Sequence, residues 1–153
     1  MGWRMPTSTW QNDLNAIAAE IRSQLGADSI YISRIQKIHH VLAQSHNHEN
    51  PEIIQEFPLE ASICKHVAEM NFELVVNDTH THPLLKDNPT VRSGGVGAYA
   101  GFPIRIRDGQ AIAVLCAIFD RIHEWTLEEQ HTIAEATKRL SPIVDELIEN
   151  SAH

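Results

Sequence analysis

Two cysteines, a tyrosine and a cluster of histidines are the side chains of this sequence with the most evident chemistry. The two thiols, Cys64 and Cys116, could form a redox pair. A reactive thiol needs a lowered pKa, however, which a helix N-terminus could supply only for Cys64. Cys116 lies in an apolar run typical of a strand, so we expect it to be inert. The residues therefore favour two buried structural cysteines.

The segment around Ser62 could bind a small anion. Ser62 is a suitable N-cap for a short helix that ends at about Met70. The backbone N–H groups of Ile63 and Cys64 would then be exposed at the helix N-terminus, where the helix dipole favours negative charge. The alternative is that Ser62 only caps the helix and that nothing binds there.

Tyr99 lies at the start of a predicted strand, directly after a long irregular segment. A buried tyrosine hydroxyl usually finds a hydrogen-bond partner, which in a pocket can be a ligand. The alternative partner is a backbone carbonyl. Gly101 on the same strand is predicted to face Cys116, and the gap beside it could be pocket space or close packing.

Ten histidines make the net charge sensitive to mild acid, and two of them have metal-ligand spacing. On a strand, His80 and His82 would point the same way and could share a metal ion. They lie beside Pro83 in a predicted loop, without a matching set of cysteines or carboxylates. Solvated loop histidines are the favoured interpretation, and no cofactor is predicted.

Length and charge exclude several classes of protein. A chain of 153 residues is enough for one domain. The 12 basic and 20 acidic side chains give a net charge of -8, which argues against a nucleic-acid partner and against a polybasic membrane anchor. No apolar run approaches the roughly 20 residues of a membrane span, and no signal-peptide core is present. We therefore expect a cytoplasmic protein that binds no membrane.

Two amphipathic helices are predicted near the ends of the chain. Apolar residues at three- and four-residue spacing predict the first over about residues 8–25. Thr126 and Glu129 form a capping box that marks the start of the second, over about 126–150. Pro142 lies inside the second helix, which predicts either a kink there or a restart with Ser141 as its cap.

The chain between these helices is typical of an antiparallel sheet. One or two strands are expected over 29–42, with short strands at 53–57 and 74–76. A long irregular segment follows over 77–97, and we expect one or two helical turns within it. Irregular segments of this length in compact domains usually have a function.

The strongest strand predictions are 99–107 and 111–119, which form a hairpin. Asp108-Gly109 between them predicts a two-residue turn with positive φ at both positions. That turn would pair Gly101 with Cys116, and Ile106 with Ala111. Because residues 111–119 are apolar on both faces, we expect this strand to be central and covered on each side.

Several segments, taken in this order, resemble a GAF domain. They are Ser62-Ile-Cys-Lys-His-Val67, Leu74-Val-Val-Asn-Asp78, Asn88-Pro-Thr-Val91, Tyr99-Ala-Gly-Phe-Pro-Ile104, Asp108-Gly109, Ala113-Val-Leu-Cys-Ala-Ile-Phe-Asp120 and Trp125-Thr-Leu-Glu-Glu129. The resemblance covers essentially the whole chain, so it implies a single domain over 1–153. It implies an α+β fold like that of GAF and PAS domains, with a central antiparallel sheet of five or six strands. The terminal helices would cover one face, and a ligand pocket would lie under the long loop and the short helix on the other.

The function that the resemblance implies is that of a sensor. Such a protein binds a small molecule or small anion and signals through its terminal helices to a partner protein, such as a histidine kinase. The candidate ligand-binding residues are Ser62, Ile63, Cys64, Tyr99, Gly101 and Cys116. The apolar stripes of both terminal helices could also support a homodimer, unless the sheet uses them fully. The sequence identifies neither the ligand nor the partner, and the chain could stand alone or be a fragment.

Two other functions remain open within the resemblance. One lineage of GAF-like enzymes reduces free methionine sulfoxide with cysteines in and around the loop before the hairpin, where this chain has none. An enzyme of that kind would have to use Cys64. Some members bind haem through a histidine, but no residue here is singled out for that role. Neither a Cys-His dipeptide for tetrapyrrole attachment nor the cyclic-nucleotide motif is present, so we expect a binding module rather than an enzyme.

Overall fold

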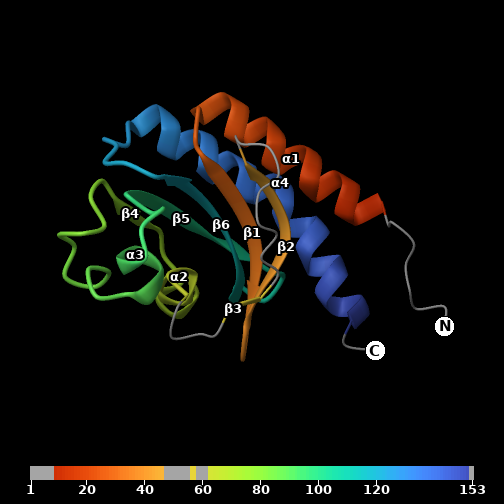
Figure 1. The fold of residues 1–153 in the computed structure, drawn as a ribbon. Helices are drawn as coiled ribbons and strands as arrows, with labels where there is room; N and C mark the ends of the chain where they lie inside the picture. The colour runs from red at the N-terminus through yellow and green to blue at the C-terminus, as the bar shows by residue number, and fades with distance from the viewer. Residues whose placement is uncertain (1–8, 47–55, 58–61, 152–153) are drawn as a thin grey trace.

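A six-stranded antiparallel sheet forms the centre of the fold (Figure 1). The structure is a computed structural model that describes residues 9–46, 56–57 and 62–151. In chain order the elements are α1 (Thr9–Leu25), β1 (Ser29–Ile35), β2 (His39–His46), β3 (Glu56–Phe57), α2 (Cys64–Met70), β4 (Leu74–Val76), α3 (Pro89–Arg92), β5 (Ala98–Arg105), β6 (Ala111–Phe119) and α4 (Leu127–Ser151). The strand order is β3-β2-β1-β6-β5-β4, which confirms the expected α+β architecture. Of the short strand expected at 53–57, residues 53–55 lie outside the described residues.

Strand β6 is central and buried on both faces, as its composition predicts. Successive side chains of a strand point to opposite faces of the sheet. Leu115 and Phe119 accordingly belong to the core under the terminal helices, whereas Cys116 and Ile118 belong to a second cluster on the other face. The sheet therefore separates two different interiors.

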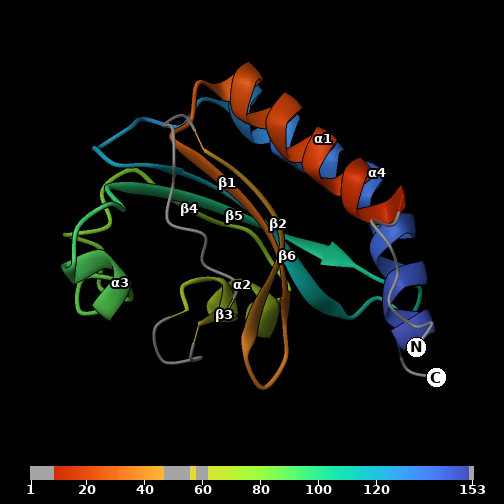
Figure 2. The same cartoon turned by 45° about the vertical axis from the view of Figure 1, so that its right-hand side comes forward.

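Helices α1 and α4 lie side by side across one face of the sheet (Figures 1 and 2). The apolar stripe of α1 is buried there, with Leu14 and Ile21 almost fully enclosed. Gly26 follows α1 with a φ of 69°, the left-handed conformation that ends a helix. Of α4, Ile133 and Leu140 are fully buried in the same core. Both stripes are thus packed on the sheet within one chain.

The capping box at the start of α4 is confirmed in both directions. The Glu129 backbone N–H donates to the Thr126 hydroxyl at 3.0 Å, and the Thr126 N–H donates to the Glu129 carboxylate at 2.9 Å. Of the two outcomes expected at Pro142, the restart is wrong, because one helix continues through this residue. The Ser141 hydroxyl donates instead to the backbone carbonyl of Arg105 on β5, which ties α4 to the sheet.

The opposite face of the sheet is covered by α2 and the segment 77–97 (Figure 2). That segment is irregular and contains the one-turn helix α3, as expected. The Asn88 side chain caps α3 by accepting a hydrogen bond from the Thr90 N–H at 2.8 Å. No helix among the described residues combines the length and apolarity needed to cross a membrane.

The predicted two-residue turn between β5 and β6 is wrong. The loop has three residues, because Ile106 and Gln110 pair across it and the Gly109 N–H donates to the Ile106 carbonyl at 2.8 Å. Gly109 has a φ of 87°, whereas Asp108 does not have a positive φ. A turn of this kind needs one left-handed residue instead of two, and the Asp108 carboxylate stabilises it by accepting from the Gln110 N–H at 3.0 Å.

This loop also changes the pairing at the end of the hairpin. Ala111 pairs with Arg105 instead of Ile106, and a register shift follows between Ile104 and Arg105. The shift restores the predicted register farther along the strands, so Gly101 does pair with Cys116. The prediction is therefore correct for the part of the hairpin that carries the candidate site.

Candidate functional site

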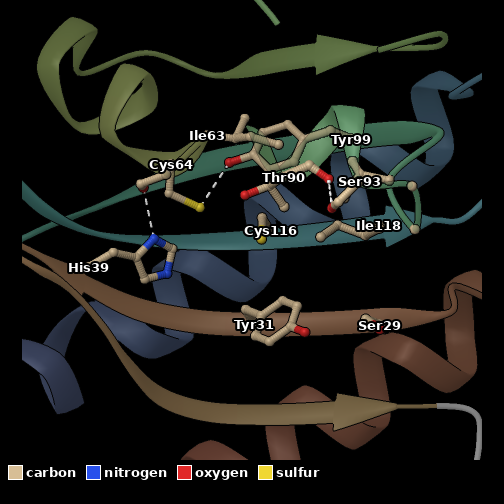
Figure 3. A pocket seen from close by; sticks show the side chains of 14 residues that line it. Ser29, Tyr31, His39, Ile63, Cys64, Thr90, Ser93, Tyr99, Cys116 and Ile118 are labelled. Atoms are coloured by element: carbon tan, nitrogen blue, oxygen red, sulfur yellow. Dashed lines mark hydrogen bonds between the residues drawn. The ribbon is translucent and has the colours of Figure 1, made fainter. Parts of the chain in front are cut away.

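A cavity of about 280 Å³ lies on the sheet face opposite α1 and α4, where the pocket was expected (Figure 3). Its floor is formed by strands β1, β5 and β6. The start of α2 and the residues around α3 enclose it from above, and His39 of β2 closes one side. The cavity thus lies between a regular sheet and an irregular cover.

The register of the three strands positions the side chains of the floor. Two rows run across β1, β6 and β5: Tyr31–Cys116–Gly101 and Ser29–Ile118–Tyr99. The strand period of two turns all these positions toward the same face. Two phenols therefore lie on opposite sides of the Cys116 thiol (Figure 3).

Gly101 provides room for the ring of Tyr99. A Cβ atom at Gly101 would lie 2.7 Å from two ring carbons of Tyr99, closer than real Cβ contacts. Gly101 does not line the cavity, because that ring fills the gap beside it. Of the two expectations for this position, close packing is the one observed.

Tyr99 and the two cysteines form a hydrogen-bonded cluster in the cavity wall. The Sγ atom of Cys64 lies 3.0 Å from the hydroxyl oxygen of Tyr99, and the Cys116 thiol contacts both groups. Burial raises the pKa of Tyr99 well above its ordinary value. The hydrogen bond with Cys64, together with burial, raises the pKa of Cys116. Tyr99 and Cys116 are therefore protonated at neutral pH, and Cys116 is a weak nucleophile.

Tyr31 gives the cavity a second neutral phenol. Burial raises its pKa to about 12, and the neighbouring Cys116 acts in the same direction. A hydrogen bond with Ser29 opposes this change. Tyr31 thus presents a hydroxyl group, not a phenolate, to the cavity over the physiological pH range.

His39 is buried between two serine hydroxyls. Its Nδ1 atom lies 2.8 Å from the Ser62 oxygen, and its Nε2 atom lies 2.8 Å from the Ser33 oxygen. Burial lowers the pKa of His39 to about 4, with a smaller contribution from His40. The ring is therefore neutral at pH 7, where one nitrogen donates and the other accepts.

Ser62 lies one residue before Ile63, which is the N-cap of α2 and makes no side-chain cap hydrogen bond, instead of being the N-cap that the sequence predicts. Its hydroxyl oxygen accepts a hydrogen bond from the Lys65 N–H at 3.1 Å, three residues along the chain. The same hydroxyl contacts His39. Ser62 lines the cavity, but its hydroxyl already has two partners within the protein, the His39 ring and the Lys65 N–H.

Five of the six candidate residues predicted from the sequence line the cavity. They are Ser62, Ile63, Cys64, Tyr99 and Cys116. The sequence reasoning missed Tyr31 and His39. Tyr31 could have been found by pairing the strand at 29–35 with the central strand at 111–119, but alternation alone does not identify a strand's partner. His39 lies within the strands expected over 29–42 and begins β2, but nothing in the sequence distinguished it from the other histidines.

The other histidines do not form a metal cluster in the part of the chain that the structure describes, where no three His, Cys, Asp or Glu side chains lie together. His80 is exposed and His82 half-buried, both in the turns after β4. His123 stacks on Phe119 at 3.9 Å between ring centroids and contacts the Glu129 carboxylate at 2.9 Å. These histidines lie outside the cavity lining.

Comparison with known proteins identifies a family. The sequence model of the GAF domain matches residues 10–142, most of the chain. No curated protein sequence matches this chain.

Solved structures with the same fold include sensors and enzymes. The PixJ GAF domain of Thermosynechococcus elongatus has a TM-score of 0.76 at 18% identity, over 94% of this chain and 89% of that one. The GAF domain of a phosphoenolpyruvate-protein phosphotransferase from Coxiella burnetii has a TM-score of 0.76 at 15% identity, over 96% and 89%. The type II free methionine-R-sulfoxide reductase of Thermoplasma acidophilum has a TM-score of 0.72 at 14% identity, over 90% and 93%. At these identities the similarity establishes the fold, which the chain shares with both classes of protein.

Proposed function

The chain belongs to the GAF domain family, and we propose that it is a sensor that binds a small molecule in its cavity and signals to a partner protein. The cavity is the observation that carries this proposal. Its cover consists of a seven-residue helix and an irregular segment. A cavity lined by apolar groups and a few convergent polar groups is the usual form of a small-molecule site.

The sheet offers a direct route from the cavity to the terminal helices. Ile118 lines the cavity, and its neighbour Phe119 belongs to the core under α1 and α4. On β5, Tyr99 lines the cavity, and the Arg105 carbonyl accepts a hydrogen bond from Ser141 of α4. A ligand that moves β5 or β6 would therefore move α4. Such a shift of a packed helix is a common way to transmit a signal.

The partner would contact the outer surfaces of α1 and α4. Their apolar stripes are packed on the sheet, so a homodimer or a signalling partner such as a histidine kinase would use the polar faces of these helices. An ion pair between Glu20 and Arg139, with 2.7 Å between Oε2 and Nη1, already joins the two helices on that side. Homodimer formation remains a prediction.

A ligand screen with a filled-cavity variant tests the proposal. A compound present at ~100 times its dissociation constant stabilises the folded state by about 2.7 kcal/mol, which is readily measured as a shift in Tm. Cys116→Leu places a larger side chain in the cavity wall and should abolish the shift. Cys116→Ala, at the same position, should retain it. A shift of equal size in Cys116→Leu, or no shift from a broad set of metabolites, would contradict the proposal.

A second candidate function is a thiol-dependent reductase, favoured by the contact between Cys64 and Cys116 in the cavity wall. In such a reaction the Cys64 sulfur attacks the sulfoxide sulfur, the oxygen is transferred from that sulfur to Cys64, and the products are a Cys64 sulfenic acid, which keeps the thiol proton, and free methionine. The Cys116 thiol then displaces this oxygen as water and forms a disulfide, which an external dithiol reduces. Turnover of free methionine sulfoxide that is lost in Cys64→Ser would support this function. Full turnover by a cysteine-free variant would exclude it.

No observation in the described residues favours a haem or metal site. His39 is the histidine that lines the cavity, and both of its ring nitrogens are within hydrogen-bond distance of serine hydroxyls. Coordination of a metal would require the ring to leave at least one of these contacts.

A further inference from the structure

We infer that the cavity selects uncharged molecules of about the size of a single ring and excludes charged ones of the same size. This inference rests on the proposed function and identifies its class of ligand. It also chooses between the two ligand types that the sequence analysis kept open: it favours a neutral small molecule over a small anion.

The composition of the cavity wall is the first argument. Among residues 9–46, 56–57 and 62–151, those that line the cavity carry hydroxyl, thiol, aliphatic or glycine groups, together with the imidazole of His39, and none of them is Lys, Arg, Asp or Glu. A charged ligand gives up its hydration when it is buried and needs an opposite charge in return. The described wall offers no such charge.

The ionisable groups of the wall do not supply one either. His39 is neutral at pH 7, because burial lowers its pKa to about 4. Tyr31 and Tyr99 have raised pKa values and stay protonated, as does Cys116. The wall therefore remains uncharged at these four positions throughout the pH range of a cell.

The polar groups of the wall are bonded mainly to one another. The Cys64 thiol contacts the Tyr99 hydroxyl, and Ser62 contacts His39. Ser62 also uses the Lys65 N–H, one of the donors at the start of α2. The wall is thus largely satisfied without a ligand, which favours a molecule that needs a few hydrogen bonds and no counter-charge.

The two cationic residues next in sequence to the wall do not line it. Lys65 follows Cys64, and Arg92 precedes Ser93, but neither lines the cavity. Arg92 is exposed and lies 3.5 Å from the Asp87 carboxylate, measured between Nη1 and Oδ1. A buried anion could not use these two cations without a rearrangement of the cover.

The volume limits the size of the ligand. At about 280 Å³, the cavity is slightly smaller than the ~300–1,000 Å³ of ordinary ligand pockets. A molecule with one ring, or an aliphatic molecule of similar size, fits this volume. A tetrapyrrole is too large for it.

Alkylation of Cys64 tests this selectivity without knowledge of the natural ligand. Iodoacetamide and iodoacetate are nearly identical in size, but the first is neutral and the second is an anion. The two rates are measured by mass spectrometry on Cys116→Ser, so that Cys64 is the only thiol, in the folded protein and in urea. The ratio of the iodoacetamide rate to the iodoacetate rate should be at least tenfold larger in the folded protein than in the unfolded one.

Equal ratios in the two states would overturn the inference, as would a folded Cys64 that neither reagent modifies. A matched variant tests the physical cause. Thr90 is half-buried and lines the cavity, so Thr90→Lys adds a cation to the wall and should move the ratio at least threefold toward iodoacetate. No change in the ratio would contradict the electrostatic explanation.

These outcomes are separate from those of the proposed function. A charged metabolite that stabilises the protein, with its effect lost in Cys116→Leu, would refute the charge selectivity and leave the sensor proposal intact. Selective alkylation together with a screen in which no metabolite binds would support the charge selectivity and contradict the sensor proposal.

Discussion

The two faces of the sheet are built from the same strands but have different interiors. Under α1 and α4, alternate residues of β6 are Ala113, Leu115, Ala117 and Phe119, and they pack against continuous apolar stripes of two long helices. On the other face, Cys116 and Ile118 meet a seven-residue helix and an irregular segment. The first face is a filled core, whereas the second encloses a cavity.

This difference assigns stability to one face and binding to the other. Two helices with a regular period can fill the space above a sheet with aliphatic side chains, as dense cores require. A short helix and a loop leave space, and the polar groups beside that space satisfy one another through Cys64–Tyr99 and His39–Ser62. Variants that affect one face and spare the other can test this assignment.

The largest expected effect is a difference in stability between alanine variants of two neighbouring residues of β6. Leu115 is fully buried under the terminal helices, and Cys116 lies in the cavity wall. Leu115→Ala should lower the free energy of unfolding by about 2–5 kcal/mol, because it leaves a void in a filled core. Cys116→Ala removes one sulfur beside existing space and should cost about 1 kcal/mol or less. Urea unfolding measures both, and similar losses would contradict the division of roles.

The filled face is also the one that the sequence predicts best. The three- and four-residue spacing of α1, the capping box of α4 and the continuous apolar run of β6 are local signals, and each is confirmed. These signals are readable because repeated apolar positions are required whenever a long element packs on a sheet. The restart at Pro142, one of the two expected outcomes, does not occur, because tertiary packing, including the Ser141 contact with β5, retains a helix that local propensity would interrupt.

The next effect is the pH dependence of the free energy of unfolding, to which His39 on the cavity face contributes. The pKa of His39 is lowered from 6.5 to about 4, so between these values the unfolded chain binds a proton that the folded protein excludes. The contribution of His39 is fully present above pH 6.5 and is lost as the pH falls toward 4, to an extent of about 3 kcal/mol. His39→Gln should remove this part of the pH dependence.

Urea unfolding at a series of pH values measures the effect. The matched control is His131→Gln, the same substitution at an exposed position of α4. A wild-type slope that matches that of His39→Gln between pH 6.5 and 4 would show that the ring is not buried in its neutral form.

A smaller effect is the loss of stability when alanine replaces either of two glycines that have different neighbours. A Cβ at Gly101 would approach ring atoms of Tyr99 at 2.7 Å, whereas a Cβ at Gly97 would approach backbone atoms of Arg121 at 2.5 Å. Gly101→Ala should cost about 1–3 kcal/mol, because the Tyr99 ring must move. Tyr99→Leu in the same chain should recover part of that cost, since the obstructing ring is gone.

The control is Gly97→Ala, where the obstruction is backbone and Tyr99→Leu should give no recovery. A double-mutant cycle by urea unfolding measures the two couplings. Equal coupling of Tyr99 to both glycines would contradict the packing described for the cavity wall.

The cavity face was only partly predictable, for a physical reason. Cys64 and Tyr99 were found because their chemistry is unusual, but their mutual contact joins residues 35 positions apart and depends on how the cover folds. Tyr31 and His39 reach the same cavity through β1 and β2, whose partners cannot be derived from alternation. The predicted length of the hairpin turn was wrong for a similar reason. Asp-Gly is compatible with both two-residue and three-residue loops, and the choice depends on the twist of the flanking strands.

The smallest effect tests whether the two faces are independent. Thr126→Ala removes the hydroxyl that accepts the Glu129 N–H at 3.0 Å, and the loss of such a cap costs about 0.5–2 kcal/mol. The cap lies at the start of α4, outside the cavity lining. If the faces are separate, this variant lowers the free energy of urea unfolding and leaves the ratio of Cys64 alkylation by iodoacetamide and iodoacetate unchanged. A changed ratio would contradict the division of roles at this end of α4, which lies away from the Ser141 contact with β5 that the proposed signalling route uses.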